Sequence, residues 1–287
     1  MRLDEATRAA LRGERRLAAA LGALEIVPAS VTPLAALQPW SRTPRTYEVV
    51  TATDERLKIR FARRARFAER AARLTRRLGD PRVPPPLAVS GTAMVERWVE
   101  GEPLSSLPLS GARVDAAADL LASIHRSAAG RRSTARLCAS VARRATALVE
   151  HGLLSPEIAA WLGRLVAETL PAEAAWGVTH GDFCAENLVV AGGGLLASID
   201  NEQFAWGFPA YDVARSWYRW PMPAWAEERF ARRYAAGSGT ACGPVETQAW
   251  RAVAVVRALQ YRRASRSSPA GALRALARVL GDGPAAP

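Results

Sequence analysis

The sequence predicts an α+β fold in which a small strand-rich lobe is followed by a large helical lobe. Three observations support this prediction. Apolar residues alternate with a period of two between residues 46 and 61, helical periodicity dominates after residue 112, and one hairpin is embedded among the helices at residues 188–199. Strands and helices therefore come in blocks, which argues against an alternating βαβ sheet.

The first hundred residues are expected to form two parts. Residues 1–45 contain a helix, at 4–24, and a connecting segment punctuated by prolines. Residues 46–99 form the small lobe. Its predicted elements, in order, are a hairpin of strands 46–52 and 57–61, a helix at 62–78 that ends at Gly79, and short strands at 87–89 and 92–99.

Residues 100–287 are expected to form the large lobe. Gly101-Glu102-Pro103 interrupts the strand pattern and marks the predicted boundary. The predicted helices span residues 112–128, 134–150, 155–170, 210–219, 224–236, 245–265 and 270–281. The embedded hairpin consists of apolar runs at 188–190 and 195–199, joined by Gly192-Gly193-Gly194.

The bulk composition excludes several classes of protein. No stretch is apolar enough to predict a membrane-spanning helix, and charges fill the first sixteen residues, where a secretory signal would need an apolar run. Cys138, Cys184 and Cys242 are odd in number and widely spaced, so neither a disulfide framework nor a zinc site is predicted. The sequence therefore predicts a cytoplasmic protein.

The net charge is +12, and 38 of the 39 basic residues are arginine. A basic balance can indicate nucleic acid, an anionic membrane surface or an anionic substrate as partner. The abundance of alanine and arginine also fits a compositional bias, in which much of the charge is solvated surface. The arginine-rich helix at 62–78 lacks the interleaved aromatic side chains of a nucleic-acid surface, so a small-molecule partner is favoured.

Polar residues gather around the embedded hairpin. Asp182 lies just before it, Asn187 opens its first strand, Asp200 ends its second strand and Glu202 follows. Because a tight hairpin returns its second strand beside its first, Asp200 is brought back near Asn187. A carboxylate and an amide oxygen at one end of a hairpin can bind Mg²⁺, and a second carboxylate nearby can accept a hydroxyl proton. Phosphoryl transfer uses such a layout.

Several motifs resemble one family. His180-Gly181-Asp182-Phe183-Cys184-Ala185-Glu186-Asn187 resembles the catalytic loop of the aminoglycoside phosphotransferase and choline kinase superfamily. Ile199-Asp200-Asn201-Glu202 is similar to that family's metal-binding segment, and residues 207–215 to the segment that follows it. Residues 120–125 resemble a family helix that ends in histidine, and residues 95–104 its lobe-connecting hinge. The resemblance covers roughly residues 45–220.

The resemblance implies a two-lobed protein-kinase-like fold with residues 46–99 as the nucleotide-binding lobe. It implies that Asp182 is the catalytic base and that Asn187 and Asp200 bind Mg²⁺. The backbone of residues 96–98, from Glu96 to Trp98, would meet the adenine edge of ATP, and GTP is the alternative nucleotide. Two further residues would position the catalytic loop, His180 within it and Asp212 through hydrogen bonds, while His125 is expected to be a packed residue.

Lys58 is the only lysine of the chain and lies on the second strand of the first hairpin. In this fold a strand lysine contacts the α- and β-phosphates and pairs with a helix glutamate. Glu69 is the only acidic residue in the helix that follows, so the sequence predicts a Lys58–Glu69 pair.

The sequence departs from the family pattern at the loop expected to cover the phosphates. Residues 38–47 contain no glycine, although such loops use glycine to bring backbone amides close to a nucleotide. Arg42 or Arg45 could supply charge instead, and Ser41 or Thr43 a hydroxyl. The alternative is a weakened nucleotide site, and hence a pseudoenzyme or binding protein with a kinase fold.

The acceptor is expected to be a neutral or anionic hydroxyl compound, sugar-like or antibiotic-like. From Phe204 onward there are five acidic residues against twelve arginines, whereas a polycationic aminoglycoside calls for a pocket lined by acids. A pocket needs only two or three carboxylates, so an aminoglycoside-type resistance kinase stays open as an alternative.

Overall fold

The computed structural model describes residues 15–34, 46–126, 130–239, 244–265 and 267–281. The chain divides into two compact units. The first comprises Met1–Leu107 and Glu186–Ala205, and the second comprises Pro108–Ala185 and Trp206–Pro287. Each unit is described by itself below.

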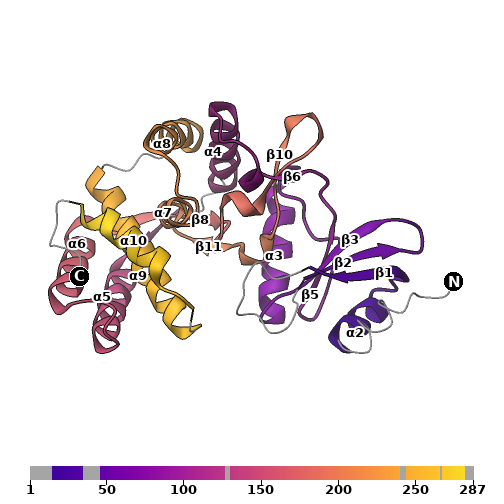
Figure 1. Cartoon of the computed structure of the whole chain (residues 1–287), viewed down its shortest axis with the longest axis horizontal. Helices are drawn as coiled ribbons and strands as arrows, with labels where there is room; N and C mark the ends of the chain where they lie inside the picture. The colour runs from indigo at the N-terminus through magenta and orange to yellow at the C-terminus, as the bar shows by residue number, and fades with distance from the viewer. Residues whose placement is uncertain (1–14, 35–45, 127–129, 240–243, 266, 282–287) are drawn as a thin grey trace. The chain divides into compact units, whose positions relative to one another are not determined.

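The first unit is built on an antiparallel five-stranded sheet of order β1-β2-β3-β5-β4 (Figure 1). Its strands are β1 (Pro28–Pro33), β2 (Thr46–Thr51), β3 (Arg56–Phe61), β4 (Ala88–Ser90) and β5 (Ala93–Arg97). The helices are α2 (Arg15–Ala23) and α3 (Ala65–Leu78). The predicted hairpin and the two predicted short strands are thus present, and α3 ends at Gly79 in the left-handed conformation, as the sequence indicated.

The two faces of the sheet have different neighbours. Leu57, Ile59 and Phe61 of β3 pack in an apolar core with Leu17 and Leu21 of α2. Because side chains alternate along a strand, the even-numbered residues of β3 point to the opposite face. Helix α3 contacts β4, β5 and the short turn η4 (Asn201–Gln203). One face of β3 is therefore apolar core, and the other carries polar residues.

The embedded hairpin belongs to the first unit. It consists of β9 (Leu188–Val190) and β10 (Leu196–Ser198), joined by η3 (Gly192–Gly194), and β6 (Glu102–Pro103) pairs with β9. The 3-10 turns η1 (Leu104–Ser106) and η2 (Ala185–Asn187) flank this sheet in the sequence. A Cβ at Gly101 would lie 2.3 Å from the carbonyl oxygen of Val190, so only glycine lets the segment before β6 approach β9 this closely.

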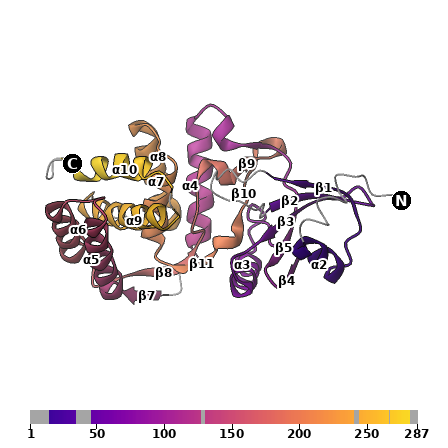
Figure 2. The same ribbon diagram turned by 60° about the horizontal axis from the view of Figure 1, so that its bottom comes forward.

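The second unit is mainly helical. Its helices are α4 (Gly111–His125), α5 (Ala135–Glu150), α6 (Pro156–Thr169), α7 (Pro209–Arg219), α8 (Ala224–Ser238), α9 (Pro244–Ala264) and α10 (Ala270–Leu280). Strands β7 (Gly130–Ser133), β8 (Glu173–Thr179) and β11 (Ala205–Gly207) form a small sheet of order β11-β8-β7. Helix α9 packs against α5, α6, α7 and α10, and α4 packs against α8 (Figure 2).

The core of the second unit surrounds α9. Trp250 and Val253 of α9 are buried with Leu162 of α6, Trp217 of α7 and Leu276 of α10. The rest of α9 supplies mainly alanine and valine to this core, which allows the neighbouring helices to approach closely. Among the described residues, no helix is both long enough and apolar enough to cross a membrane.

The strands that the sequence analysis missed are short or lie in sequence that is poor in strand signals. Residues 28–33 were expected to be a connecting segment, but they form β1, the edge strand of the sheet among the described strands, and proline is tolerated at an edge. Strands β7, β8 and β11 were also missed. The predicted domain boundaries at 45/46 and 99/100 remain a prediction, whereas the compact units group the hairpin 186–205 with the strand-rich part.

Candidate active site

The polar face of β3 carries Lys58 and Arg60, which lie two residues apart and so point the same way. Lys58 forms an ion pair with Asp200 Oδ1. Arg60 pairs through one nitrogen with Asp200 Oδ2 and through another with Glu202 Oε1, at 2.8 Å. Both oxygens of Asp200 are thus held by cations from one strand.

Glu96 completes this cluster and corrects one prediction. It lies opposite Lys58 in the β3–β5 register, is 6% exposed, and its Oε2 lies 3.8 Å from Lys58 Nζ. Glu69, by contrast, is exposed on α3. The predicted Lys58–Glu69 pair was wrong because the acidic partner comes from the neighbouring strand and not from the helix.

The hairpin places Asn187 and Asp200 beside each other, as the sequence predicted. The N–H of Ile199 donates to the carbonyl oxygen of Asn187 at 2.9 Å, so Asp200 stands one residue beyond the last hydrogen-bonded position. Asp200 adopts the left-handed conformation, with φ 61° and ψ 42°, which is uncommon for a residue with a side chain. Strained backbone of this kind concentrates at functional sites.

The cluster contains more buried acid than base. Glu96, Asp200 and Glu202 face Lys58 and Arg60, and among the described residues Glu96 Oε1 and Glu202 Oε2 are buried without a hydrogen-bond donor. Burial raises the pKa of Glu202 to about 7 against the opposing effect of Arg60, and burial also raises the pKa of Glu96. Burial acts in the same direction on Asp200, but the charges of Lys58 and Arg60 outweigh it and lower the pKa.

These properties fit a divalent cation. Two unpartnered buried carboxylate oxygens in a cluster with more acids than bases would be stabilised by one more cation. Asn187 neighbours Ile199 and Asp200 across the hairpin, and its residue type offers an amide oxygen of the kind that binds Mg²⁺. The described residues contain no group of three or more His, Cys, Asp or Glu side chains that would hold a metal without other ligands. Mg²⁺ sites in phosphoryl-transfer proteins commonly use one or two protein ligands and complete their shell with phosphate and water.

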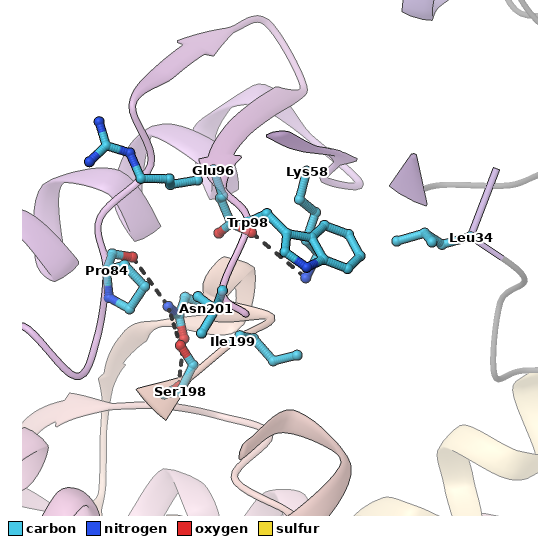
Figure 3. Close-up of a pocket in the computed structure, with 10 residues that line it drawn as sticks. Leu34, Lys58, Pro84, Glu96, Trp98, Ser198, Ile199 and Asn201 are labelled. Atoms are coloured by element: carbon cyan, nitrogen blue, oxygen red, sulfur yellow. Dashed lines mark hydrogen bonds and ion pairs between the residues drawn. The ribbon is translucent and has the colours of Figure 1, made fainter. Parts of the chain in front are cut away.

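A pocket opens beside this cluster within the first unit (Figure 3). Lys58, Glu96, Trp98, Ile199 and Asn201 line it, together with Leu34, Pro84, Arg97, Val99 and Ser198. Figure 3 shows Asn201 held by hydrogen bonds to Pro84 and to Ser198, which anchors the floor of the pocket. The predicted hinge residues Glu96 and Trp98 therefore line a pocket together with Lys58.

In the hinge, the backbone N–H and C=O of Arg97 are oriented so that a ligand could bind them. The N–H of Trp98 donates to the carbonyl oxygen of Arg56 at 3.1 Å, inside the sheet. Backbone groups alternate in direction along an antiparallel strand, so the N–H and C=O of Arg97 point away from β3. They point to the side of β5 on which β4 lies, but β4 pairs only with residues 93–95 and does not extend to Arg97. The free backbone edge of the hinge is centred on Arg97.

The second unit carries the loop with Asp182. Asp212, at the start of α7, is fully buried and accepts hydrogen bonds from the N–H of His180 at 2.7 Å and of Gly181 at 3.0 Å. The N–H of Asp182 donates to His180 Nδ1 at 3.2 Å. These are the positioning hydrogen bonds expected from the sequence, and they fix the backbone on both sides of Gly181.

His125 supports Asp212 from α4. Its Nε2 lies 3.2 Å from Asp212 Oδ2 and its Nδ1 lies 2.7 Å from the hydroxyl of Tyr234. Burial by itself would raise the pKa of Asp212, but the hydrogen bond from His125 and the nearby histidines lower it. His125 is 3% exposed, in agreement with the prediction that it is packed.

Two arginines of α7 contact the carboxylate of Asp182. Arg215 Nη2 lies 3.1 Å and Arg219 Nε 3.4 Å from the same oxygen, Oδ1. Burial would lower the pKa of Arg215, but the charge of Asp182 outweighs it and raises the pKa, so Arg215 stays protonated. Arg219 also contacts the sulfur of buried Cys184 at 3.5 Å, which agrees with a packing role for this cysteine.

Sequence reasoning missed three residues of these clusters, namely Arg60, Arg215 and Arg219. Arg60 could have been found from its position two residues after Lys58 on a strand. Arg215 and Arg219 are one helical turn apart and follow Asp212, but arginine is so common in this chain that no single one stands out. The glycine-free segment 38–47, with Arg42, Arg45, Ser41 and Thr43, lies mostly outside the described residues.

The first unit thus carries an acid-rich cluster beside a pocket, and the second unit carries an aspartate on a loop fixed by hydrogen bonds. Comparison with known proteins identifies the family. Residues 36–256 match the model of the phosphotransferase enzyme family (APH), which is more than half of the chain. The chain belongs to this family, and the prediction of a phosphotransferase that acts on an alcohol group is confirmed.

Solved structures show the same fold. A macrolide 2'-phosphotransferase, MphH from Brachybacterium faecium, is 17% identical, with a TM-score of 0.65 over 95% of this chain and 100% of that one. The choline kinase LicA from Streptococcus pneumoniae is 15% identical, with a TM-score of 0.64 over 94% and 98%. The AMP-bound spectinomycin phosphotransferase APH(9)-Ia is 10% identical, with a TM-score of 0.63 over 93% and 95%. No curated protein sequence gave a significant match.

The predicted fold and superfamily are therefore confirmed. The chain has the two-lobed kinase-like fold of these enzymes and is a small-molecule phosphotransferase of the aminoglycoside phosphotransferase and choline kinase type.

Proposed function

We propose that this protein is a kinase that uses ATP or GTP with Mg²⁺ and transfers the γ-phosphate to a hydroxyl group of a small molecule. The observation that carries the proposal is the environment of Asp200. This strained aspartate stands next to Asn187, and cations hold both of its oxygens inside a cluster with surplus negative charge.

The nucleotide base is assigned to the pocket of Figure 3. A base edge would bind the N–H and C=O of Arg97, between the predicted hinge residues Glu96 and Trp98. AMP complexes of LicA and of the spectinomycin phosphotransferase support nucleotide use in this fold.

Asn187 and Asp200 would hold Mg²⁺, which when bound neutralises charge on the nucleotide phosphates. Lys58 and Arg60 would then exchange part of their contact with Asp200 for phosphate oxygens, because both side chains lie on the same face of β3. Glu96 would keep Lys58 in place during this exchange.

Asp182 would act as the base. As the acceptor hydroxyl attacks the γ-phosphorus, its proton would pass to the carboxylate of Asp182. A new phosphorus–oxygen bond forms, the bond to the β,γ-bridging oxygen breaks, and the nucleoside diphosphate leaves with that oxygen. Asp212 and His180 would hold the loop so that the carboxylate keeps its orientation.

The acceptor is proposed to be a neutral or anionic hydroxyl compound, sugar-like or antibiotic-like. The solved relatives include enzymes for macrolides, choline and spectinomycin, which supports a small molecule as acceptor.

The test is release of nucleoside diphosphate from ATP and from GTP, with Mg²⁺, against a panel of hydroxyl compounds. At least one acceptor should raise release above the rate without acceptor, and Asp182→Asn should lower that rate by about 10²- to 10⁴-fold. Arg232→Gln, an exposed charge change on α8, is the matched control.

A kinase-fold binding protein predicts the opposite result. It would bind nucleotide with the same affinity in the wild type and in Asp182→Asn and would show no acceptor-dependent release. Full transfer activity in Asp182→Asn would rule out the assigned base.

A further inference from the structure

We infer that Trp98 is the surface on which the nucleotide base stacks, and that Arg56 is the positioning residue that fixes its indole ring. The site would then favour purine over pyrimidine nucleotides by the area of the base. The inference rests on the proposed function, because it names what the base contacts in the nucleotide pocket of that site.

Trp98 and Arg56 are cross-strand neighbours. The register of β3 and β5 pairs Lys58 with Glu96, so two positions along each strand Arg56 lies opposite Trp98. The N–H of Trp98 donates to the carbonyl oxygen of Arg56 at 3.1 Å, which fixes the backbone of this pair. The sheet therefore places both side chains on the face that carries Lys58, a proposed phosphate ligand.

The guanidinium of Arg56 covers one face of the indole. Its central carbon lies 4.5 Å from the centre of the Trp98 ring. Its Nε and Nη2 donate to Glu48 Oε1 at 2.9 and 2.8 Å, and its Nη1 donates to Glu100. Two carboxylates thus hold all three nitrogens, and the planar group is fixed against the ring.

We assign the opposite face of the indole to the pocket. Trp98 lines the pocket of Figure 3, whereas Arg56 is not part of its lining. Leu34, Val99 and Ile199 also line it, so much of the lining is apolar. An apolar space beside an aromatic ring fits a heterocyclic base, because the faces of a base are apolar and its polar groups lie in its edge.

Two polar side chains of the pocket have other tasks. Asn201 donates to the carbonyl oxygens of Pro84 and Ser198, at 3.4 and 3.3 Å, and accepts from the hydroxyl of Ser198 at 2.7 Å. Glu96 belongs to the acid-rich cluster, where a cation is proposed. The base is therefore recognised through the ring face of Trp98 and the backbone of the hinge.

This division of tasks determines which bases are distinguished. Stacking depends on the overlap of ring faces and is indifferent to the hydrogen-bonding groups of the base edge. A purine has two fused rings and covers more of the indole than a pyrimidine, which has one. Trp98 should therefore strengthen binding of ADP and GDP alike, while the ratio between them is determined at the backbone of Arg97.

The first experiment measures binding of ADP and of tripolyphosphate, each with Mg²⁺, to the full chain by calorimetry. Trp98→Leu stays apolar but lacks an aromatic face, so it should weaken ADP binding about 5- to 100-fold and leave tripolyphosphate binding unchanged. Trp98→Phe keeps a ring and should remain within about threefold of the wild type. Trp225→Leu, at an exposed tryptophan of α8, is the matched control.

Two results of this experiment overturn the inference. One is ADP affinity that is unchanged in Trp98→Leu. The other is an equal loss for ADP and tripolyphosphate, which would mean that Trp98 only supports the fold. Melting temperatures of all variants are measured, and Trp98→Phe tests the ring in a side chain that still fills the space.

The second experiment compares bases. The wild type should bind ADP at least about 5-fold more tightly than UDP, and Trp98→Leu should narrow this gap without changing the ratio of ADP to GDP affinity. A purine–pyrimidine gap that is the same in the wild type and in Trp98→Leu overturns the inference.

The third experiment tests Arg56. Arg56→Gln removes the cation from the indole and should weaken ADP binding about 3- to 10-fold, with tripolyphosphate binding unchanged. Arg56→Lys keeps the charge and should restore part of the loss. Arg73→Gln, at an exposed arginine of α3, is the control. Loss of tripolyphosphate binding in Arg56→Gln would make Arg56 a phosphate ligand and overturn its positioning role.

The two proposals fail in different ways. Transfer from ATP with ADP affinity that is unaffected by Trp98→Leu overturns the stacking surface and leaves the kinase intact. Absence of transfer to any acceptor, together with ADP binding that depends on Trp98, overturns the kinase and leaves the stacking surface.

Discussion

Two aspartates of this protein each contact two cations, but the elements that supply these cations and the side chains around them differ. Asp200, in the first unit, lies with Glu96 and Glu202 against Lys58 and Arg60, so acid exceeds base. In the second unit Asp182 contacts Arg215 and Arg219, both from helix α7. The comparison teaches that the cations paired with a carboxylate do not by themselves define its role. The further buried acids beside Asp200, two of which have an oxygen without a hydrogen-bond donor among the described residues, fit a bound cation.

The supports of the two aspartates also differ. Asp200 depends on strand pairing, since Asn187 and Ile199 hold the end of a short hairpin. Asp182 depends on a buried side chain, because Asp212 accepts the hydrogen bonds that fix its loop. A change in one support should therefore affect one aspartate and spare the other, and the following predictions use this independence.

The largest effect is expected for Asp200→Asn. It should lower phosphoryl transfer by about 10²- to 10³-fold and weaken binding of Mn²⁺, used as a spectroscopic substitute for Mg²⁺, because one charged oxygen ligand is lost. Electron paramagnetic resonance gives the Mn²⁺ affinity. Asp182→Asn should keep that affinity, and equal loss in both variants would contradict the division of roles.

Asp212→Asn should destabilise the protein by about 2–3 kcal/mol, because three buried hydrogen bonds to a charged acceptor are weakened. Because the pKa of Asp212 is lowered in the folded protein, its ionised form stabilises the fold at any pH above the pKa of an unfolded aspartate, about 3.9. This contribution is lost as the pH falls through the pKa of the folded state. The difference in melting temperature between wild type and Asp212→Asn should thus be full at pH 7 and shrink below about pH 4. A difference that grows on acidification would contradict this account.

Gly101→Ala tests the support of the other aspartate. The added Cβ would lie 2.3 Å from the oxygen of Val190, and φ is +145°, so the change should cost about 2 kcal/mol and should weaken Mn²⁺ binding. Chemical denaturation measures the stability. Gly79→Ala is the matched control, since its φ is +65° but a Cβ there meets open space. A smaller loss is expected for the control, with Mn²⁺ affinity unchanged.

Arg60→Gln should reduce nucleotide affinity about 10-fold, because it removes from β3 one of the two cations that we propose to bind the phosphates. Calorimetric titration with ADP and Mg²⁺ measures it. Arg97→Gln changes a side chain that is 72% exposed and binds through its backbone in our proposal, so it should leave the affinity within about twofold. Equal effects would argue that general charge, and not position on the strand, attracts the nucleotide.

The smallest effect is expected for Glu69→Gln. Nucleotide affinity should change by less than about twofold, since Glu69 is exposed and the acid beside Lys58 is Glu96. The same titration with Glu96→Gln should show a clear loss. If Glu69→Gln is the more damaging change, the lysine pairs with the helix when nucleotide is bound.

Sequence reasoning was most successful where pattern and spacing act locally. The hairpin at 188–199, the helices of the second unit and the end of a helix at Gly79 were all predicted, because periodicity and turn residues report on neighbouring positions. The neighbouring placement of Asn187 and Asp200 followed from hairpin geometry alone.

The misses have a common physical origin. Glu96 lies beside Lys58 through the register of β3 and β5, although the two residues are 38 positions apart in the sequence, and no local pattern reports a register. Strand β1 contains two prolines and resembles a connector, but its pairing with β2 decides its conformation. The sequence did not indicate the two arginines that contact Asp182, because arginine is so frequent in this chain that its presence at a position is not informative.

The grouping of hairpin 186–205 with the first unit has a practical consequence for dissection of the protein. The chain passes from one unit to the other at residues 107/108, 185/186 and 205/206. Neither unit is a single continuous segment, so a fragment that stops near residue 107 would contain Lys58, Arg60 and Glu96 but neither Asn187 nor Asp200. Such a fragment would present two cations of β3 without the aspartate that pairs with both of them. Separate expression of the first unit would therefore require the hairpin to be joined to it through a designed linker.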